Sequence, residues 1–214
     1  MAIQAFSTTF FNRAYLAACP RSGIIMGIKQ NIWRACDFPY AYSAQLPNLP
    51  QNVKFAIMAL IRKAEMRDME GVNRLLRQVL EIHHKGRPDL FNPSGKKYSD
   101  EELSGIFANP ATPVFVCDDG AGGVLGYAFC EIRDTCGSGS LKPLKTLYID
   151  DICVDEAGRG KGIGRALFNF VREFAAQQGC YNITLRVWEC NPSAAAFYAS
   201  LGMTPQYTSL ELVL

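Results

Sequence analysis

The chain has 214 residues, of which 49% are hydrophobic and 20% are charged, and its formal net charge is +2 at pH 7. This length and composition predict one globular domain with a sizeable core, plus an extension. The small net charge argues against a dedicated nucleic-acid-binding protein. Since no run approaches the ~18 apolar residues of a membrane helix, we expect no membrane-spanning segment.

The first 57 residues differ from the rest of the chain, because they show no helical or strand periodicity and contain a single acidic residue, Asp37. Three interpretations are open: a flexible or loosely docked extension, a natural translation start at Met58, or an organelle transit peptide. We therefore divide the chain into an extension, residues 1–57, and a domain, residues 58–214.

The eight cysteines are scattered, and none of them forms a C-x-x-C pair. Without the paired spacing of a zinc site, the sequence predicts no metal site. Cysteines in apolar strands behave as small hydrophobic residues, and we interpret these thiols as reduced. Reduced thiols favour a cytoplasmic location.

The sequence of the first half of the domain predicts a strand, two helices and a hairpin. After a strand at residues 59–64, Asp68 can cap a helix whose apolar positions recur at helical spacing until Gly86. A loop begins at Arg87, and Ser99 with Glu102 forms a capping box that opens a second helix. Strands at residues 114–117 and 124–131 flank a glycine-rich turn that is typical of a hairpin.

The second half continues with a flexible loop at residues 136–140 and a central strand that ends at Val154. A helix closed by Gly179 follows, then an alternating strand, and then a helix that Asn191 can cap and Gly202 ends. The alternating residues 209–214 predict a last strand.

A glycine-rich, basic turn lies between the central strand and the helix after it. Gly160, Gly162 and Gly164 alternate there, so side chains do not keep a ligand away from the backbone. The first amides of the helix have no partner within the helix and favour phosphate oxygens. The spacing matches neither G-x-G-x-x-G nor a P-loop, in which Ser or Thr follows Gly-Lys, because Gly162 follows Lys161.

The turn Arg159-Gly160-Lys161-Gly162-Ile163-Gly164 resembles the acetyl-CoA loop, R/Q-x-x-G-x-G/A, of the GCN5-related N-acetyltransferases (GNAT). Residues 191–203 resemble that family's second motif, N-x-x-A-x-x-F-Y-x-x-x-G-F, with Met203 in the last position. The resemblance runs from about Ala59 to Leu214. It implies an α/β GNAT fold, in which helices flank a central mixed, mostly antiparallel sheet.

The resemblance implies acetyl-CoA as the acetyl-donor cosubstrate, without a metal. The backbone of the central strand end would bind the pantetheine arm, the glycine turn would bind the diphosphate, and the residue that opens the last helix would contact the arm. By this resemblance, the residues that would bind acetyl-CoA are Ile152, Cys153, Val154, Arg159, Gly160, Lys161, Gly162, Ile163, Gly164, Arg165 and Asn191.

Tyr198 matches the family's general acid, which reprotonates the departing thiolate. For the base, the sequence leaves Asp150, Asp151, Glu189 and an ordered water open. Strand alternation places Asp150 and Asp151 on opposite faces of the sheet, so at most one of them is expected to face the acceptor. No partner is identifiable beside Cys153 for a covalent intermediate, and the resemblance implies direct transfer.

The acceptor would lie near the end of the first helix, where the family frames this substrate. Candidate residues are His83, Arg87, Asp89 and Tyr98, although a histidine on the apolar face of a helix is more often a packed residue. The acidic strand end favours a small cationic amine. The sequence thus predicts an N-acetyltransferase that uses direct attack in a ternary complex. Two alternative functions also stay open: a transferase for another acyl-CoA and a non-catalytic CoA-sensing domain. The oligomeric state is open as well, and a homodimer is one possibility.

Overall fold

The computed structural model describes residues 60–135 and 142–214. The predicted extension of residues 1–57, the alternative start at Met58 and the predicted loop at residues 136–140 lie outside this part of the chain.

The core of the described chain is one five-stranded sheet in the order β1-β2-β3-β4-β5. Neighbouring strands are antiparallel from β1 to β4, whereas β4 and β5 are parallel. The prediction of a mixed, mostly antiparallel sheet is therefore confirmed. The strands are β1 (Ile61–Lys63), β2 (Val114–Asp118), β3 (Val124–Thr135), β4 (Leu144–Val154) and β5 (Asn182–Leu185).

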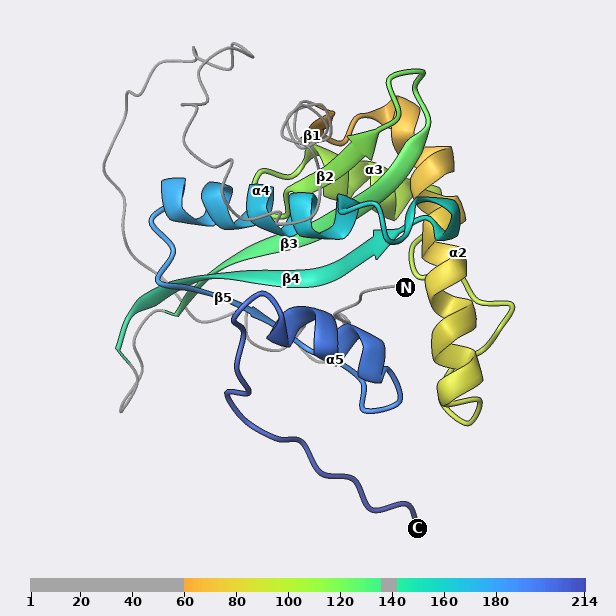
Figure 1. Ribbon diagram of the computed structural model, residues 1–214, viewed down its shortest axis with the longest axis vertical. Coiled ribbons are helices and arrows are strands. Elements are labelled where there is room, and N and C mark those ends of the chain that lie inside the picture. The colour runs from red at the N-terminus through yellow and green to blue at the C-terminus, as the bar shows by residue number, and fades with distance from the viewer. Residues whose placement is uncertain (1–59, 136–141) are drawn as a thin grey trace.

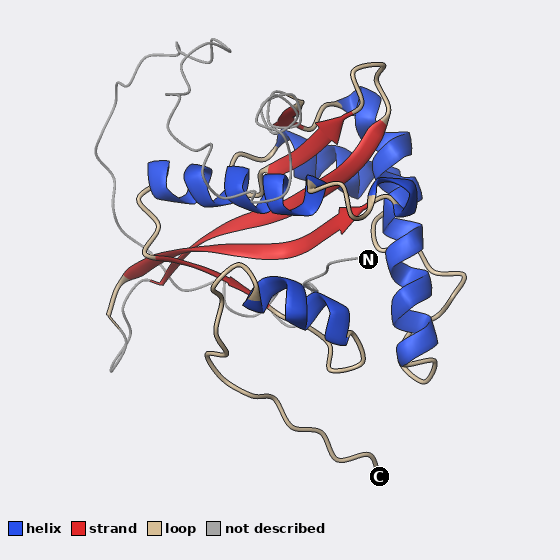
Figure 2. Ribbon diagram, in the orientation of Figure 1, coloured by secondary structure: helices blue, strands red, loops and turns tan. Residues whose placement is uncertain are grey.

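Helices cover both faces of this sheet (Figures 1 and 2). Helix α4 packs across β2 to β5, while α2 packs on the other face against β3, β4 and α3. Helix α5 follows β5 and adds Ala194 and Tyr198 to the core on the α4 side. The helices are α2 (Met69–Gly86), α3 (Asp100–Ala108), α4 (Ile163–Gln177) and α5 (Pro192–Ala199), with single 3-10 turns η1 (Met66–Asp68) and η2 (Glu156–Gly158).

Two predicted helix starts have different outcomes. The Ser99 hydroxyl accepts a hydrogen bond from the Glu102 amide at 3.2 Å, and the Glu102 carboxylate accepts one from the Ser99 amide at 2.8 Å, which confirms the capping box. Asp68 precedes α2, but its side chain does not cap that helix. Instead its carboxylate accepts the Glu65 amide at 2.8 Å and pairs with Arg62 at 2.6 Å, so the prediction of an Asp68 cap is wrong.

The predicted last strand at residues 209–214 is also wrong, because this segment forms no strand. It leaves the body of the molecule as an extended tail (Figure 1). Leu210 and Leu212 are 92% and 83% exposed. A strand needs hydrogen bonds to a neighbouring strand, and residues 209–214 pair with no strand of the described sheet. Within the tail, Glu211 forms an ion pair with Arg87 at 2.9 Å.

Candidate active site

The site lies where strands β4 and β5 separate. Their pairing ends at Ile149 and Leu185, yet β4 continues to Val154. Beyond Ile149, no strand of the described sheet pairs with the β5 side of β4. Exposed peptide groups along such an edge can bind an extended ligand by hydrogen bonds. This edge contains Ile152, Cys153 and Val154, which the sequence assigned to the pantetheine arm.

A β-bulge lies in β4 next to this edge. Phe129 of β3 pairs with Asp151, but the next residue of β3 pairs with Ile149, so Asp150 is the extra residue. Side chains of Ile149 and Ile152 both enter the core on the α4 side, three positions apart instead of two. The bulge therefore turns both Asp150 and Asp151 towards the α2 side. The prediction that these carboxylates lie on opposite faces is wrong, because it assumed an unbroken alternation.

The two carboxylates share one ammonium group. The Lys97 Nζ atom lies 2.9 Å from Asp150 Oδ2 and 3.1 Å from Asp151 Oδ2. Two hydroxyls complete the cluster: Tyr98 Oη donates to Asp150 at 2.9 Å, and Tyr127 Oη donates to Asp151 at 3.1 Å. Burial alone would lower the pKa of Lys97, but the charges of Asp151 and Asp150 outweigh it and raise this pKa. Lys97 therefore remains an ammonium ion at neutral pH.

The sequence interpretation missed both Lys97 and Tyr127. Lys97 lies in the polar loop between α2 and α3, where no periodicity singles out one residue. Tyr127 lies in a strand and reads as one more buried apolar position. No local signal could have found either residue, because each meets its aspartate across a distance of 24 or more residues.

Tyr198 is buried in α5, with 3% of its surface exposed. Its hydroxyl has no hydrogen-bond partner among the described residues. Burial, reinforced by the negative charge of Asp151, raises the pKa of Tyr198 well above its usual value. The hydroxyl thus keeps its proton at neutral pH and is available to donate it. Because a buried hydroxyl without a partner is costly, its position indicates that a ligand group belongs beside it.

The glycine turn joins η2 to α4. Gly160 and Gly162 have φ angles of +76° and +85°, a conformation that side chains disfavour. The first amide of this helix with a backbone acceptor is that of Ala166, which donates to Gly162 O at 3.0 Å. In the described chain, the amides of residues 160–165 have no hydrogen-bond acceptor, so this turn can cradle a phosphate.

Basic side chains around the turn supply positive charge that would partly balance the negative charge of a bound diphosphate. Lys161 is exposed and Arg165 is half-buried. The Arg159 Nε atom donates to Val154 O at 3.3 Å, and its guanidinium lies 3.4 Å from Glu156. Burial lowers the pKa of Arg159, but an arginine stays charged at neutral pH.

Asn191 occupies the N-cap of α5, where its side-chain oxygen accepts the Ala194 amide at 3.1 Å and the Ser193 hydroxyl at 2.9 Å. Asn191 is buried, with 5% of the residue exposed. The structural role that the sequence offered for Asn191, a helix cap, is therefore present.

Residues predicted to frame the acceptor divide into two groups. Tyr98 belongs to the carboxylate cluster, and His83 is fully buried against Phe91, with ring centroids 4.8 Å apart. Burial, with a smaller effect from Lys97, lowers the pKa of His83 to about 4, so its ring is neutral at pH 7. In contrast, Arg87 and Asp89 pair with each other at 2.7 Å near the exposed tail.

The side chains of two other candidates form no hydrogen bond or ion pair with the carboxylate cluster. Glu189 is exposed in the turn before α5, and no contact joins it to the carboxylate cluster within the described chain. Cys153 is fully buried, and burial raises the pKa of its thiol well above its usual value. A thiol that resists ionisation is a poor nucleophile, which fits the expectation of direct transfer.

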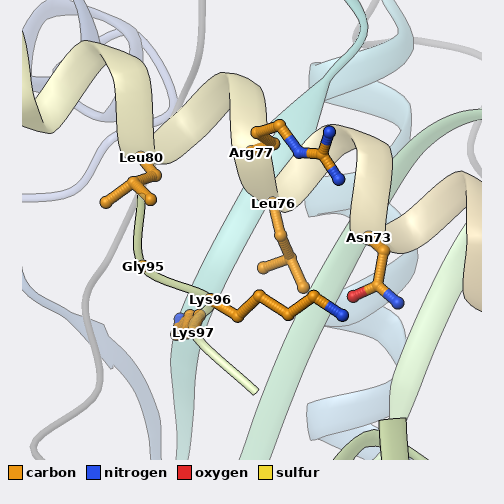
Figure 3. A pocket seen from close by; sticks show the side chains of 7 residues that line it. All are labelled: Asn73, Leu76, Arg77, Leu80, Gly95, Lys96 and Lys97. Carbon is orange, nitrogen blue, oxygen red and sulfur yellow. The ribbon is translucent and has the colours of Figure 1, made fainter. Parts of the chain in front are cut away.

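A pocket lies between α2 and the loop that carries Lys97 (Figure 3). Its lining includes the cations Arg77, Lys96 and Lys97, but neither Asp150 nor Asp151. Among residues 60–135 and 142–214, no group of three or more metal-ligating side chains comes together.

None of the helices in the same ranges has the length and apolar character that crossing a membrane requires.

Comparisons with known proteins agree with this geometry. The model of the Acetyltransferase (GNAT) family matches residues 76–203. A solved structure of a mutant BH1408 protein from Bacillus halodurans is 34% identical and superposes with a TM-score of 0.70, covering 72% of this chain and 98% of the other.

Two curated relatives carry enzyme names. "Probable glucosamine 6-phosphate N-acetyltransferase 2" of Oryza sativa subsp. japonica is 34% identical over 87 residues, which cover 41% of this chain and 48% of the relative. The match thus spans about half the length of that protein. "Thialysine N-epsilon-acetyltransferase" of Bos taurus is 26% identical over 153 residues, 67% of this chain and 82% of the relative.

Proposed function

Because this chain belongs to the GNAT family of acetyltransferases, we propose that it transfers an acetyl group from acetyl-CoA to a small primary amine by direct attack in a ternary complex. The observation that carries the proposal is the glycine turn. Six consecutive amides, those of residues 160–165, have no acceptor in the described chain and lie at the start of α4. Such an array suits the diphosphate of a CoA thioester.

The thioester supplies an activated acetyl group, and the chain's residues would then handle two protons. An amine arrives as an ammonium ion and must lose a proton before its nitrogen can attack. Asp150 is the base that we favour, since its Oδ1 atom has no hydrogen-bond partner among the described residues and its side chain is 10% exposed, whereas that of Asp151 is 0% exposed. A carboxylate oxygen without a partner in the described chain can accept that proton.

At the other end of the reaction, Tyr198 is the general acid that we propose. As the new C–N bond forms and the C–S bond breaks, the sulfur leaves as a thiolate and needs a proton. The Tyr198 hydroxyl is protonated and has no partner among the described residues. Its donation to the thiolate would give a neutral thiol. The second proton that the nitrogen loses as the amide forms would restore the Tyr198 hydroxyl, and the proton held by Asp150 would return to solvent.

The acceptor class rests on charge and on the names of the relatives. Two carboxylates at one site favour a cation, and the named relatives act on glucosamine 6-phosphate and thialysine, which both carry a primary amine. We therefore propose a small molecule with a primary ammonium group.

The test is turnover of acetyl-CoA by the full chain with a panel of amines that includes glucosamine 6-phosphate and thialysine, followed by mass spectrometry of the products. An acetylated amine with matching CoA release supports the proposal. Turnover only with a longer acyl-CoA would assign another acyl donor. Binding of acetyl-CoA without any turnover across the panel would favour the non-catalytic sensing domain.

A further inference from the structure

The Lys97 side chain presents a primary ammonium ion to the carboxylates at which the proposed reaction needs a primary amine. Its Nζ atom bridges Asp150 and Asp151 at 2.9 and 3.1 Å. The side chain is 12% exposed, and those of the two aspartates are 10% and 0% exposed. A flexible, unbranched amine is thus already bound at this site, and it belongs to the chain itself.

We propose that the Lys97 ammonium occupies the acceptor's amine subsite, and that a cationic primary amine enters by displacing it. This inference rests on the proposed function and adds to it a residue that determines which acceptor amines can bind. Lys97 would be a specificity-determining residue, because a molecule can enter only if it replaces the positive charge that leaves.

The charge balance supports a displacement. Two buried carboxylates share one ammonium, and removing that ammonium without replacing it would leave buried negative charges uncompensated. A neutral or anionic molecule cannot provide that compensation, whereas a primary ammonium can. The Oδ1 atom of Asp150 is buried and lacks a partner in the described chain, so this carboxylate has an oxygen left for a ligand to contact.

The local structure also allows Lys97 to leave. Its charged end is buried, but it is carried by the loop between α2 and α3, in which residues 92–96 are exposed. Loops of this kind move more easily than packed helices and strands, since few buried contacts hold them. The neighbouring Lys96 has the same side chain but is 64% exposed and lies 3.7 Å from Asp100, so it provides a matched control.

The test removes the ammonium and returns it as a free molecule. Lys97→Ala retains Cβ, so n-propylammonium supplies the atoms that are missing. We would titrate n-propylammonium into the wild-type chain, Lys97→Ala and Lys96→Ala, each saturated with CoA. The proposal predicts that Lys97→Ala alone binds n-propylammonium at least roughly tenfold more tightly than the wild type, since the amine no longer competes with Lys97. The neutral isostere n-propanol should not bind.

The outcomes separate this inference from the proposed function. If Lys97→Ala binds CoA as the wild type does but gains no affinity for n-propylammonium, the displacement model is wrong. If the wild-type chain does not bind CoA, the proposed function itself fails.

A second measurement covers the case in which Lys97→Ala does not fold. In the wild-type chain, nitrogen-15 NMR of the lysine ammonium groups should show the buried Lys97 signal shift or disappear at saturating n-propylammonium. An unchanged Lys97 signal while acetyl-CoA and the chain convert n-propylamine to N-propylacetamide would overturn the proposal, because the acceptor would then react without displacing the lysine.

Discussion

Asp150 and Asp151 are neighbours in strand β4, yet both present a carboxylate to the same ammonium ion, that of Lys97. A regular strand would place them on opposite faces of the sheet. The bulge at Asp150 removes this separation and gathers two acids on the α2 side. The paired acids suit the ammonium substrate that we propose, and the bulge places the proposed base next to an open strand edge.

Tyr198→Phe tests the general acid. We expect kcat to fall roughly 10²- to 10⁴-fold, because the leaving thiolate loses its proton donor. Stability should be unchanged or slightly higher, since the hydroxyl that is removed is buried and has no partner among the described residues. Acetyl-CoA affinity should stay within about threefold of the wild type.

The control for this prediction is Tyr181→Phe, which removes the hydroxyl of a tyrosine that is 71% exposed. It should leave kcat unchanged. Equal turnover by Tyr198→Phe and Tyr181→Phe would contradict the role of Tyr198.

Asp150→Asn distinguishes the candidate bases. The amide cannot accept the amine's proton, so we expect kcat/KM to fall roughly 10²- to 10⁴-fold in steady-state assays with a primary amine. Glu189→Gln should retain the wild-type value, because Glu189 is exposed and does not contact the carboxylate cluster. A large loss in Glu189→Gln with little change in Asp150→Asn would reassign the base.

Gly160→Ala tests the cofactor turn. A Cβ atom at Gly160 would meet no protein atom within 4 Å, so it would enter the space left for the ligand. We expect the Kd for acetyl-CoA to rise roughly tenfold. The positive φ angle of +76° should also lower the free energy of unfolding by about 1 kcal/mol.

Gly179→Ala is the matched control, since Gly179 has a φ angle of +70° and equally open surroundings but lies at the far end of α4. This variant should lose similar stability in urea unfolding and keep its acetyl-CoA affinity. A parallel loss of affinity in both variants would attribute the effect to general destabilisation.

His83 should make stability depend on pH. Burial lowers its pKa from 6.5 to about 4, so between these values the unfolded chain binds a proton that the folded chain does not. The stability contribution is therefore intact above pH 6.5 and is lost as the pH falls. Between pH 7 and pH 5 the loss attributable to His83 should be about 2 kcal/mol.

Urea unfolding of the wild type and His83→Phe at both pH values measures this loss. His83→Phe should have the shallower pH dependence. Identical slopes in the wild type and His83→Phe would show that the His83 ring is not the group that titrates.

The parts of the site that were predicted from sequence depend on local geometry. Gly160 and Gly162 were identified because a turn with positive φ angles selects glycine whatever surrounds it. The Ser99 capping box is equally local, since its two hydrogen bonds span three residues. The helical spacing that placed His83 on the apolar face of α2 also holds, because that face is buried by the sheet.

The parts that were not predicted depend on distant partners. The bulge at Asp150 exists only in relation to β3, and Lys97 reaches its aspartates across more than fifty residues. The tail shows the converse error, in which an alternating pattern around Leu210 predicted a strand without a strand to pair with. Side-chain alternation indicates which residues share a face of a strand, but it does not show that a second strand lies beside them to form hydrogen bonds.

The central claim is that the glycine turn binds the diphosphate of acetyl-CoA, and calorimetric titration of acetyl-CoA into the full chain tests it most directly. The account predicts saturable one-to-one binding that Gly160→Ala weakens and Gly179→Ala does not. A folded chain, verified by circular dichroism, that shows no saturable binding of acetyl-CoA would contradict it.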